Sequence, residues 1–300
     1  MILRALSTLA LALPATLIAQ DAAAPGKRAL VFQRPETKDA KYELTSKASF
    51  NQTTDFHIEG EVRPGGRKSM EVTLEGTFAV TAVSPTAGNV TGYTFTINKM
   101  TLTDGSGADD GLEPGTVITA KVEKAGTTFY AHGGEVKGTL KDGLAEALPQ
   151  FSGLDEPHDE LFHPPGPVAP GDKWEPDKTK YAETLQKIRH AELDSEKSKV
   201  RLTYSGPAKA DGMEADTVLI SHSVTYTKFP GLPDDAVLKS ATETSDVTIA
   251  IAKDAKISAP LSERANSDFD FSFTTNRDGN EYEVVYKTHS DVRRTMKPVK

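Results

Sequence analysis

The sequence predicts a mainly β protein made of two antiparallel modules, each a curved sheet or half-barrel, joined by a proline-rich hinge and accompanied by one or two short helices. Two observations lead to this prediction. Segments along most of the chain alternate apolar and polar side chains with a period of two, which is typical of half-buried strands. The composition also favours strands and turns over helices, because the 300 residues include 23 Gly, 18 Pro and 33 Thr.

The first nineteen residues are typical of a secretory signal peptide. Arg4 supplies the positive charge, and the apolar run from Ala5 to Ala19 is shorter than the about 20 residues that a bilayer-spanning helix needs. We therefore expect cleavage after Ala19, a flexible tail over 20–28, and a location in the periplasm or outside the cell. No later segment has the pattern of a transmembrane helix. The sequence has no Cys, which excludes disulfides, and the short signal together with the absence of Cys indicates a bacterial protein.

The N-terminal module is expected over 29–153. Its clearest strand is Met70 to Val83, where apolar side chains recur at every second position. In Thr91 to Leu102 the apolar positions change phase at Asn98-Lys99, which predicts a β-bulge. Pro64-Gly65-Gly66 is expected to form a turn, and Asp142 to Leu148 a short helix with Asp142 as its N-cap. The other strands expected in this module cover 42–50, 56–62, 116–123 and 127–131.

The proline-rich hinge is expected over 154–178. Proline fixes φ and lacks an N–H donor, so a stretch this rich in proline predicts an extended connector. The C-terminal module then covers 179–300. We expect a helix from Asp177 to Ala191 near its start, because Tyr181, Leu185 and Ile188 share one helical face. Strands are expected over 200–204, 217–229, 246–252, 268–274 and 282–286, with Asp278-Gly279 as a hairpin turn.

The end of the hinge reads Pro167-Val168-Ala169-Pro170-Gly171-Asp172-Lys173-Trp174. It resembles a Pro-Val-x-Pro-Gly-Asp-x-Trp segment in the middle of exported bacterial proteins of unknown function that have two antiparallel β modules in tandem. The resemblance covers about fourteen residues around this segment and implies architecture and compartment. It implies no active-site residue, because that family has no established reaction. We expect the Pro-Gly-Asp turn and Trp174 to act as a structural clamp between the modules.

Aromatic side chains on the apolar faces of the strands are the candidates for a binding groove. If the sheets curve without closing, these faces can line a groove for a lipid, a hydrophobic peptide or an acyl chain; the simpler alternative is that they fill the core of each sheet. The candidates are Tyr93, Phe95, Phe269, Phe271, Phe273, Tyr282 and Tyr286, together with Trp174 at the hinge.

The hinge also contains the candidate metal ligands of the chain. His158, Asp159, Glu160 and His163 place two imidazoles and two carboxylates within six residues, but their spacing matches no zinc signature, and a solvated acidic loop is the simpler interpretation. The sequence contains no motif for a nucleophile or a phosphate-binding loop, and we expect no cofactor. The net charge of −8 argues against a nucleic-acid partner.

These observations favour a non-catalytic protein of the bacterial envelope that binds a hydrophobic ligand in a groove of one curved sheet. One alternative is a secreted hydrolase that uses His and carboxylate side chains near the hinge. Another is a structural surface protein that contacts other envelope proteins. The sequence leaves open whether the two modules share one continuous sheet.

Overall fold

A computed structural model gives the fold of most of the chain beyond residue 25. The residues that it describes are 26–32, 36–58, 61–85, 88–105, 107, 111–123, 126–149, 151, 159–189, 191–229, 232–233, 235–277 and 280–299. The expected signal peptide over 1–19 and most of the expected tail over 20–28 lie outside these residues.

In chain order the elements are β1 (Lys41–Ile58), β2 (Glu61–Val83), β3 (Val90–Asp104), β4 (Val117–Glu123), β5 (Gly126–Ala131), β6 (Gly134–Glu135), α1 (Gly138–Ala147), α2 (Asp159–Phe162), β7 (Lys173–Trp174), α3 (Lys178–Arg189), β8 (Glu192–Leu193), β9 (Lys199–Ala210), β10 (Met213–Lys228), β11 (Val237–Ala252), β12 (Ser262–Arg277) and β13 (Asn280–Pro298).

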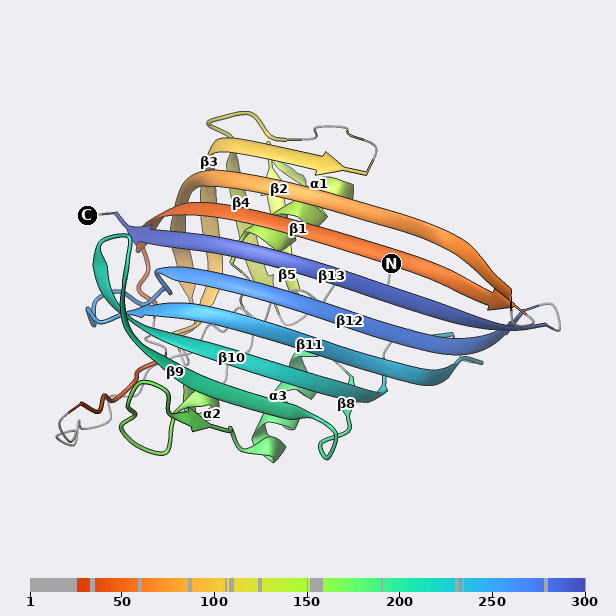
Figure 1. The fold of residues 1–300 in the computed structure, drawn as a ribbon. Coiled ribbons are helices and arrows are strands. Elements are labelled where there is room, and N and C mark those ends of the chain that lie inside the picture. Colours follow the sequence, from red (N-terminus) through yellow and green to blue (C-terminus); the bar gives the residue numbers. More distant parts are fainter. Residues whose placement is uncertain are drawn as a thin grey trace.

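The strands of the described chain join one antiparallel sheet in the order β6-β5-β4-β3-β2-β1-β13-β12-β11-β10-β9-β7, with β8 paired to β10. The sheet is open, because its two edge strands in the described part, β6 and β7, do not pair with each other. Each half of the chain forms its own series of neighbouring strands, and the two series meet where β1 pairs with β13 from Tyr42↔Pro298 to Ile58↔Tyr282. The prediction of a mainly β protein with curved antiparallel sheets is confirmed, and the two halves share one continuous sheet (Figure 1).

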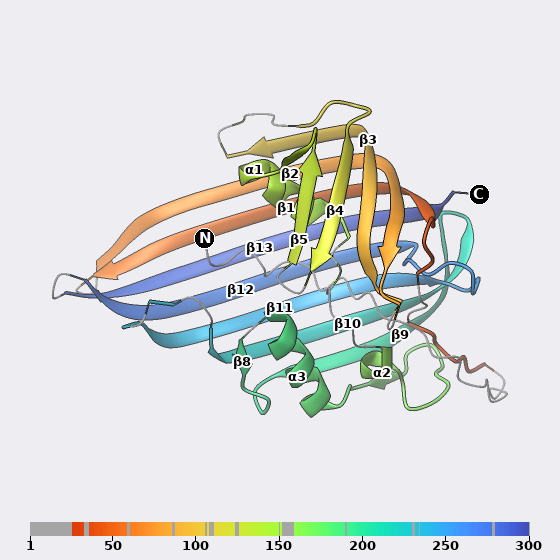
Figure 2. The same ribbon diagram turned by 180° about the vertical axis from the view of Figure 1, so that it is seen from behind.

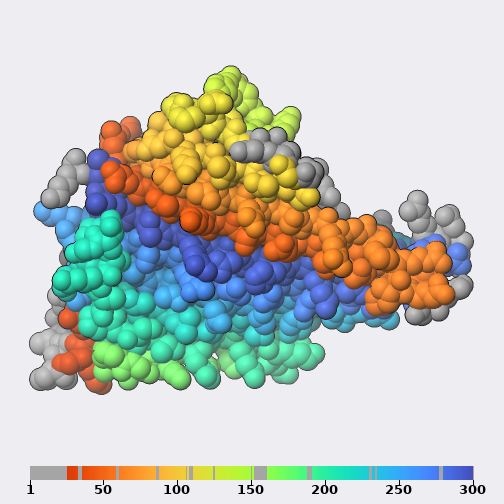
Figure 3. Space-filling view, turned by 45° about the horizontal axis from the view of Figure 1, so that its top comes forward, coloured from red at the N-terminus to blue at the C-terminus, as the bar shows by residue number. Residues whose placement is uncertain are grey.

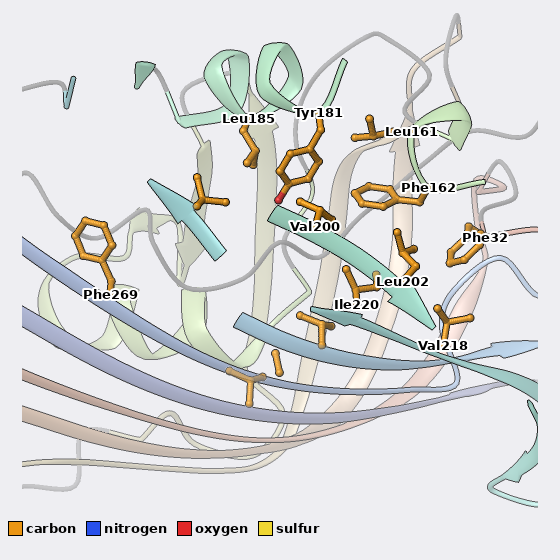
Figure 4. Packing of buried hydrophobic residues seen from close by; sticks show 14 of the residues in the cluster. Phe32, Leu161, Phe162, Tyr181, Leu185, Val200, Leu202, Val218, Ile220 and Phe269 are labelled. Atoms are coloured by element: carbon orange, nitrogen blue, oxygen red, sulfur yellow. The ribbon is translucent and has the colours of Figure 1, made fainter. Parts of the chain in front are cut away.

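The three helices of the described residues lie on one face of this sheet, which we call the inner face; the other is the outer face (Figure 2). Two apolar clusters cover the inner face, one around α1 and β2 to β5 and the other beneath α2 and α3. In the second cluster Tyr181 and Leu185 of α3 and Phe162 of α2 point toward Val200 and Leu202 of β9 (Figure 4). The predicted helix is therefore confirmed with Tyr181 and Leu185 on its buried face, while the side chain of Ile188 lies outside the described residues.

The sheet continues beyond the helices as a long end formed by β1, β2, β12 and β13, where the orange and blue strands taper together (Figure 3). We call it the far end and define it by residues 51–58, 61–68, 271–277 and 280–288. Burial alternates strictly from Lys41 to Ala48 in β1, but every side chain from Gln52 to Ile58 is partly exposed. Because the alternation stops there, solvent reaches both faces of β1 and β2 in the far end, whereas Phe271, Ser272, Thr274 and Tyr286 of β12 and β13 stay buried.

The predicted turn at Pro64-Gly65-Gly66 is wrong. These residues lie inside β2, where Asp55 pairs with Pro64 and Thr54 pairs with Gly66, so that Gly65 is the extra residue of a β-bulge. A Cβ on Gly65 would lie 2.4 Å from the Phe56 ring, so this glycine lets the ring pack on the strand backbone. These three residues therefore bend β2 locally and do not end it.

The predicted N-cap at Asp142 is also wrong. The helix α1 begins at Gly138, and its N-cap Lys137 makes no capping side-chain hydrogen bond. Asp142 lies within the helix, where its Oδ2 accepts a hydrogen bond from Lys68 Nζ at 3.4 Å. The Asp142 carboxylate therefore forms a tertiary ion pair with Lys68 instead of the helix cap that the local sequence predicts.

The predicted bulge at Asn98-Lys99 is confirmed. Glu75 pairs with Lys99 and Gly76 pairs with Ile97, which leaves Asn98 without a partner residue on β2. A Cβ on Gly76 would lie 2.2 Å from the backbone oxygen of Thr96, so only glycine allows β2 and β3 to approach this closely. The turn Asp278-Gly279 lies outside the described residues, but β12 and β13 pair as the expected hairpin, down to Arg277↔Asn280.

Candidate ligand-binding surface

Phe269, Phe271 and Phe273 form a strip along the inner face of β12, which we call the aromatic strip. The centroids of neighbouring rings are 5.8 Å and 5.5 Å apart, within the range of aromatic contacts. Phe229, directly after β10, packs on the first two rings at 5.7 Å and 5.3 Å. Phe269 and Phe271 are buried, whereas Phe273 is partly exposed. The strip therefore leads from the core to the far end.

A row of apolar side chains crosses the inner face of the far end at Phe273. We call it the Phe273 row, and it consists of Phe56, Val284, Phe273 and Leu238, directly opposite one another on β1, β13, β12 and β11. All four side chains are partly exposed. Since neighbouring strands are about 4.8 Å apart, the row is about 14 Å long. The candidates Tyr286, buried and opposite Phe271, and Tyr282, partly exposed, lie on β13 beside it.

Tyr93 and Phe95, the other two strand candidates, lie in the separate cluster around α1. Both are fully buried, and the Tyr93 ring packs against Phe78 and Phe151 at 4.7 Å and 5.6 Å between centroids. Burial raises the pKa of the Tyr93 phenol above its usual value. The structure thus brings four of the seven strand candidates close together around β12 and β13, places Tyr282 near them, and assigns Tyr93 and Phe95 to the opposite half.

Trp174 lies at the edge of the sheet, away from the aromatic strip. Its Nε1 donates a hydrogen bond to the backbone oxygen of Phe162 at 2.9 Å, and its ring packs edge-on against Phe32 at 6.0 Å. The two-residue strand β7 pairs Trp174 with Leu202 of β9. Trp174 therefore ties the proline-rich segment to β9 and has the environment of a structural residue.

The candidate metal ligands are only partly described. His158 and the side chains of Asp159 and Glu160 lie outside the described residues, and half-buried His163 packs edge-on against Phe32 at 5.9 Å. Among the side chains that the structure describes, no group of three His, Asp or Glu could hold a metal ion.

A buried polar network, which the sequence did not predict, links α3 to the sheet. The Tyr181 hydroxyl lies 3.2 Å from His222 Nδ1, and His222 Nε2 lies 3.6 Å from Glu243 Oε1. Glu243 Oε2 accepts a hydrogen bond from the Tyr226 hydroxyl at 2.5 Å. All four side chains are buried. The one signal in the sequence is His222, which lies on the apolar face of its strand. No local pattern shows that it meets the other members, because Tyr181 lies on α3, Glu243 on β11 and Tyr226 further along β10.

A second unpredicted group holds α1 on the inner face. Arg294 is 2% exposed and donates hydrogen bonds to the backbone oxygens of Glu146 and Ala147 at 2.6 Å and 2.9 Å. Its Nη1 also bonds Glu263 Oε2 at 3.0 Å. These carbonyl groups end α1 and have no partner within the helix, so the buried cation caps its C-terminus.

No protein-family model matches the chain, and no curated protein matches it. Among solved structures, one of lipid–protein interactions in lipovitellin is similar over 85% of this chain, with a TM-score of 0.34 and 9% identity. The chain spans only 25% of the length of that lipovitellin chain. A structure of the MucA/MucB complex from Pseudomonas aeruginosa is similar over 80% of this chain and 88% of its own, with a TM-score of 0.19 and 10% identity. At these TM-scores neither structure informs the function of the chain.

In the described part of the chain, no helix is both long and apolar enough to cross a bilayer.

Proposed function

We propose that the protein is a non-catalytic binding protein of the bacterial envelope that holds an acyl chain against the inner face of the far end. The observation that carries the proposal is the Phe273 row, in which four neighbouring strands present apolar side chains that stay partly exposed. Exported location is part of the proposal and rests on the expected signal peptide at 1–19.

The outer face of the same strands differs in chemistry. Its positions next to the Phe273 row carry His57 and Glu283, whose Nδ1 and Oε2 atoms are 3.6 Å apart. An antiparallel sheet with one solvated face normally packs its apolar face on a core. Here the apolar side continues past the helices, so its exposed area is available to a ligand. Single exposed apolar residues are ordinary, whereas a contiguous apolar surface is typical of a binding site.

An acyl chain fits this surface because the contacts that it offers are apolar and arranged in a line. From the Phe273 row the aromatic strip continues inward along β12 as the buried rings of Phe271 and Phe269, which support the row from the core side. Covering the remaining exposed area of four large apolar side chains contributes on the order of a few kcal/mol. This binding free energy is sufficient for a ligand of low solubility, and binding of this kind requires no catalytic group.

Titration with a fluorescent fatty-acid probe, such as cis-parinaric acid, tests the proposal. Phe273→Asp places a charge in the row and is expected to weaken binding at least tenfold, since an apolar ligand cannot solvate a carboxylate. Lys287→Asp is the matched control, because Lys287 is exposed on the outer face of the neighbouring strand. Circular dichroism of both variants checks that they fold. Equal probe affinity in Phe273→Asp, Lys287→Asp and the unchanged protein would overturn the proposal.

A further inference from the structure

A cationic side chain continues the Phe273 row on the inner face of the far end. Arg63 of β2 lies directly opposite Phe56, so it is the next member of the row beyond β1. Residues directly opposite one another on neighbouring strands share a face of the sheet. The Arg63 side chain is 64% exposed. An exposed guanidinium group therefore stands at the β2 end of an apolar row about 14 Å long.

The β-bulge at Gly65 places Arg63 on the inner face. In β2 beyond the bulge the inner-face residues have even numbers, as Met70 does, and odd-numbered residues such as Arg67 lie on the outer face. Unbroken alternation would put Arg63 on the outer face as well. The extra residue changes the phase, so that Pro64 takes the outer position and Arg63 the inner one. Bulges are common beside functional sites, where they change the direction of a side chain.

The same part of β2 forms an open edge of the sheet. The pairing of β2 with β3 begins at Met70, so in the described chain no strand lies on the other side of the β2 residues before it (Figure 1). A charged group is costly to bury, whereas an acyl chain gains from leaving water. A head group at Arg63 can stay in water at this edge while the acyl chain covers the row.

The contacts of Arg63 leave its guanidinium able to bind an anion. Its ion-pair partner is Glu61, with Nη2 and Oε2 3.7 Å apart and both side chains largely exposed. An exposed pair of this kind contributes little to stability. A ligand oxyanion that accepts two parallel hydrogen bonds from the planar guanidinium can therefore replace it. Lys68, another cation on the inner face of β2, instead bonds Asp142 of α1 at 3.4 Å.

The charge near the other end of the row is negative. Asp235, shortly before β11, accepts hydrogen bonds from the Asn276 backbone N–H and the Thr275 hydroxyl of β12, both at 3.0 Å. These hydrogen bonds hold the pKa of the Asp235 carboxyl below its usual value, so it is ionised at neutral pH. An anionic head group is therefore attracted to the β2 end of the row and repelled from the β11 end.

We infer that Arg63 binds the head group of the ligand, and that the ligand is an amphiphile with an anionic oxygen head group, a carboxylate or a phosphate. This inference rests on the proposed function. The acyl chain lies on the Phe273 row, and the head group lies at the β2 edge, where the guanidinium donates hydrogen bonds to its oxygens. Arg63 is thus the residue that favours an anionic amphiphile over a neutral one and sets the direction of the bound chain.

The test uses dodecanoate, dodecyl phosphate and 1-dodecanol as competitors of the fluorescent probe on the full chain at neutral pH. All three compete with the same probe, so a change in probe affinity cancels in the ratio of their affinities. In Arg63→Gln the affinity of an anionic ligand relative to dodecanol is expected to fall about fivefold, as for the loss of one exposed charge pair. The ligand whose ratio falls more, dodecanoate or dodecyl phosphate, identifies the head group as a carboxylate or a phosphate.

Arg67→Gln is the matched control, because it removes the same charge from the outer face of the same strand, where Arg67 is exposed opposite Thr53. It is expected to keep both ratios. Unchanged ratios in Arg63→Gln, or an equal fall in the two variants, would overturn the inference and leave the proposed function standing. Displacement by none of the three ligands, together with no probe binding, would overturn both.

Discussion

Removing the Arg294 guanidinium is expected to destabilise the protein strongly, because this buried cation joins α1 to two strands. Arg294→Met keeps most of the apolar volume of the side chain. It leaves the Glu263 carboxylate, whose side chain is 11% exposed, without its cation, and the backbone oxygens of Glu146 and Ala147 without their donor. Breaking a buried ion pair by removing one partner costs about 3–5 kcal/mol. We expect the free energy of unfolding to fall by about that amount.

Urea unfolding of the full chain at pH 7, followed by circular dichroism, measures this change. Arg293→Met is the matched control, because Arg293 is exposed on the outer face and bonds Asp291 at 3.2 Å; it is expected to change stability by less than about 0.5 kcal/mol. Adding Glu263→Gln to Arg294→Met removes the unpaired carboxylate and is expected to restore part of the loss. A cost below about 1 kcal/mol for Arg294→Met would refute this account of α1.

Two further predictions concern the N-terminal half. Burial raises the pKa of the Glu36 carboxyl to about 7, although its hydrogen bond from Tyr42 acts in the opposite direction. The folded state therefore holds this proton more tightly than the unfolded chain does. The free energy of unfolding is expected to fall as the pH rises from about 4.5 through 7. Urea midpoints measured across that range are expected to change less in Glu36→Gln, and an identical fall in the variant would assign the pH dependence to other groups. Gly76→Ala is expected to lower the free energy of unfolding in urea by about 1–3 kcal/mol, since its Cβ would clash with a backbone oxygen of β3. Gly134→Ala, at an exposed and open position, is the control. An equal effect of the two substitutions would contradict the close approach of β2 and β3.

Features that depend on neighbouring residues were predictable from the sequence. The alternation in Met70 to Val83, the change of phase at Asn98 and the helical face of Tyr181 and Leu185 all reflect the position of one strand or helix against a core. They are confirmed because local geometry and burial act in the same direction there. Asp142 shows the limit of this approach, because an ion pair with Lys68, 74 residues away, outweighs its preference for a cap.

The arrangement of the candidate site depends on contacts between distant residues, and the sequence holds little information about them. The pairing of β1 with β13 brings Phe56 beside Val284, and no local pattern signals that the first and last strands meet. In the same way Tyr181, His222 and Glu243 come from three elements. The aromatic pattern of β12 was visible, but its division into a buried part at Phe269 and a partly exposed part at Phe273 follows from where the covering elements end.

Photo-crosslinking tests the central claim, that the inner face of the far end holds the ligand, most directly. A long-chain fatty acid with a diazirine in its chain is bound to the protein and activated by light, and the labelled residues are located by peptide mass spectrometry. The account predicts labels at Phe56, Phe273 and Val284 that an excess of unlabelled fatty acid removes. Labels that resist competition, or that fall on outer-face positions such as His57 and Glu283, would contradict it.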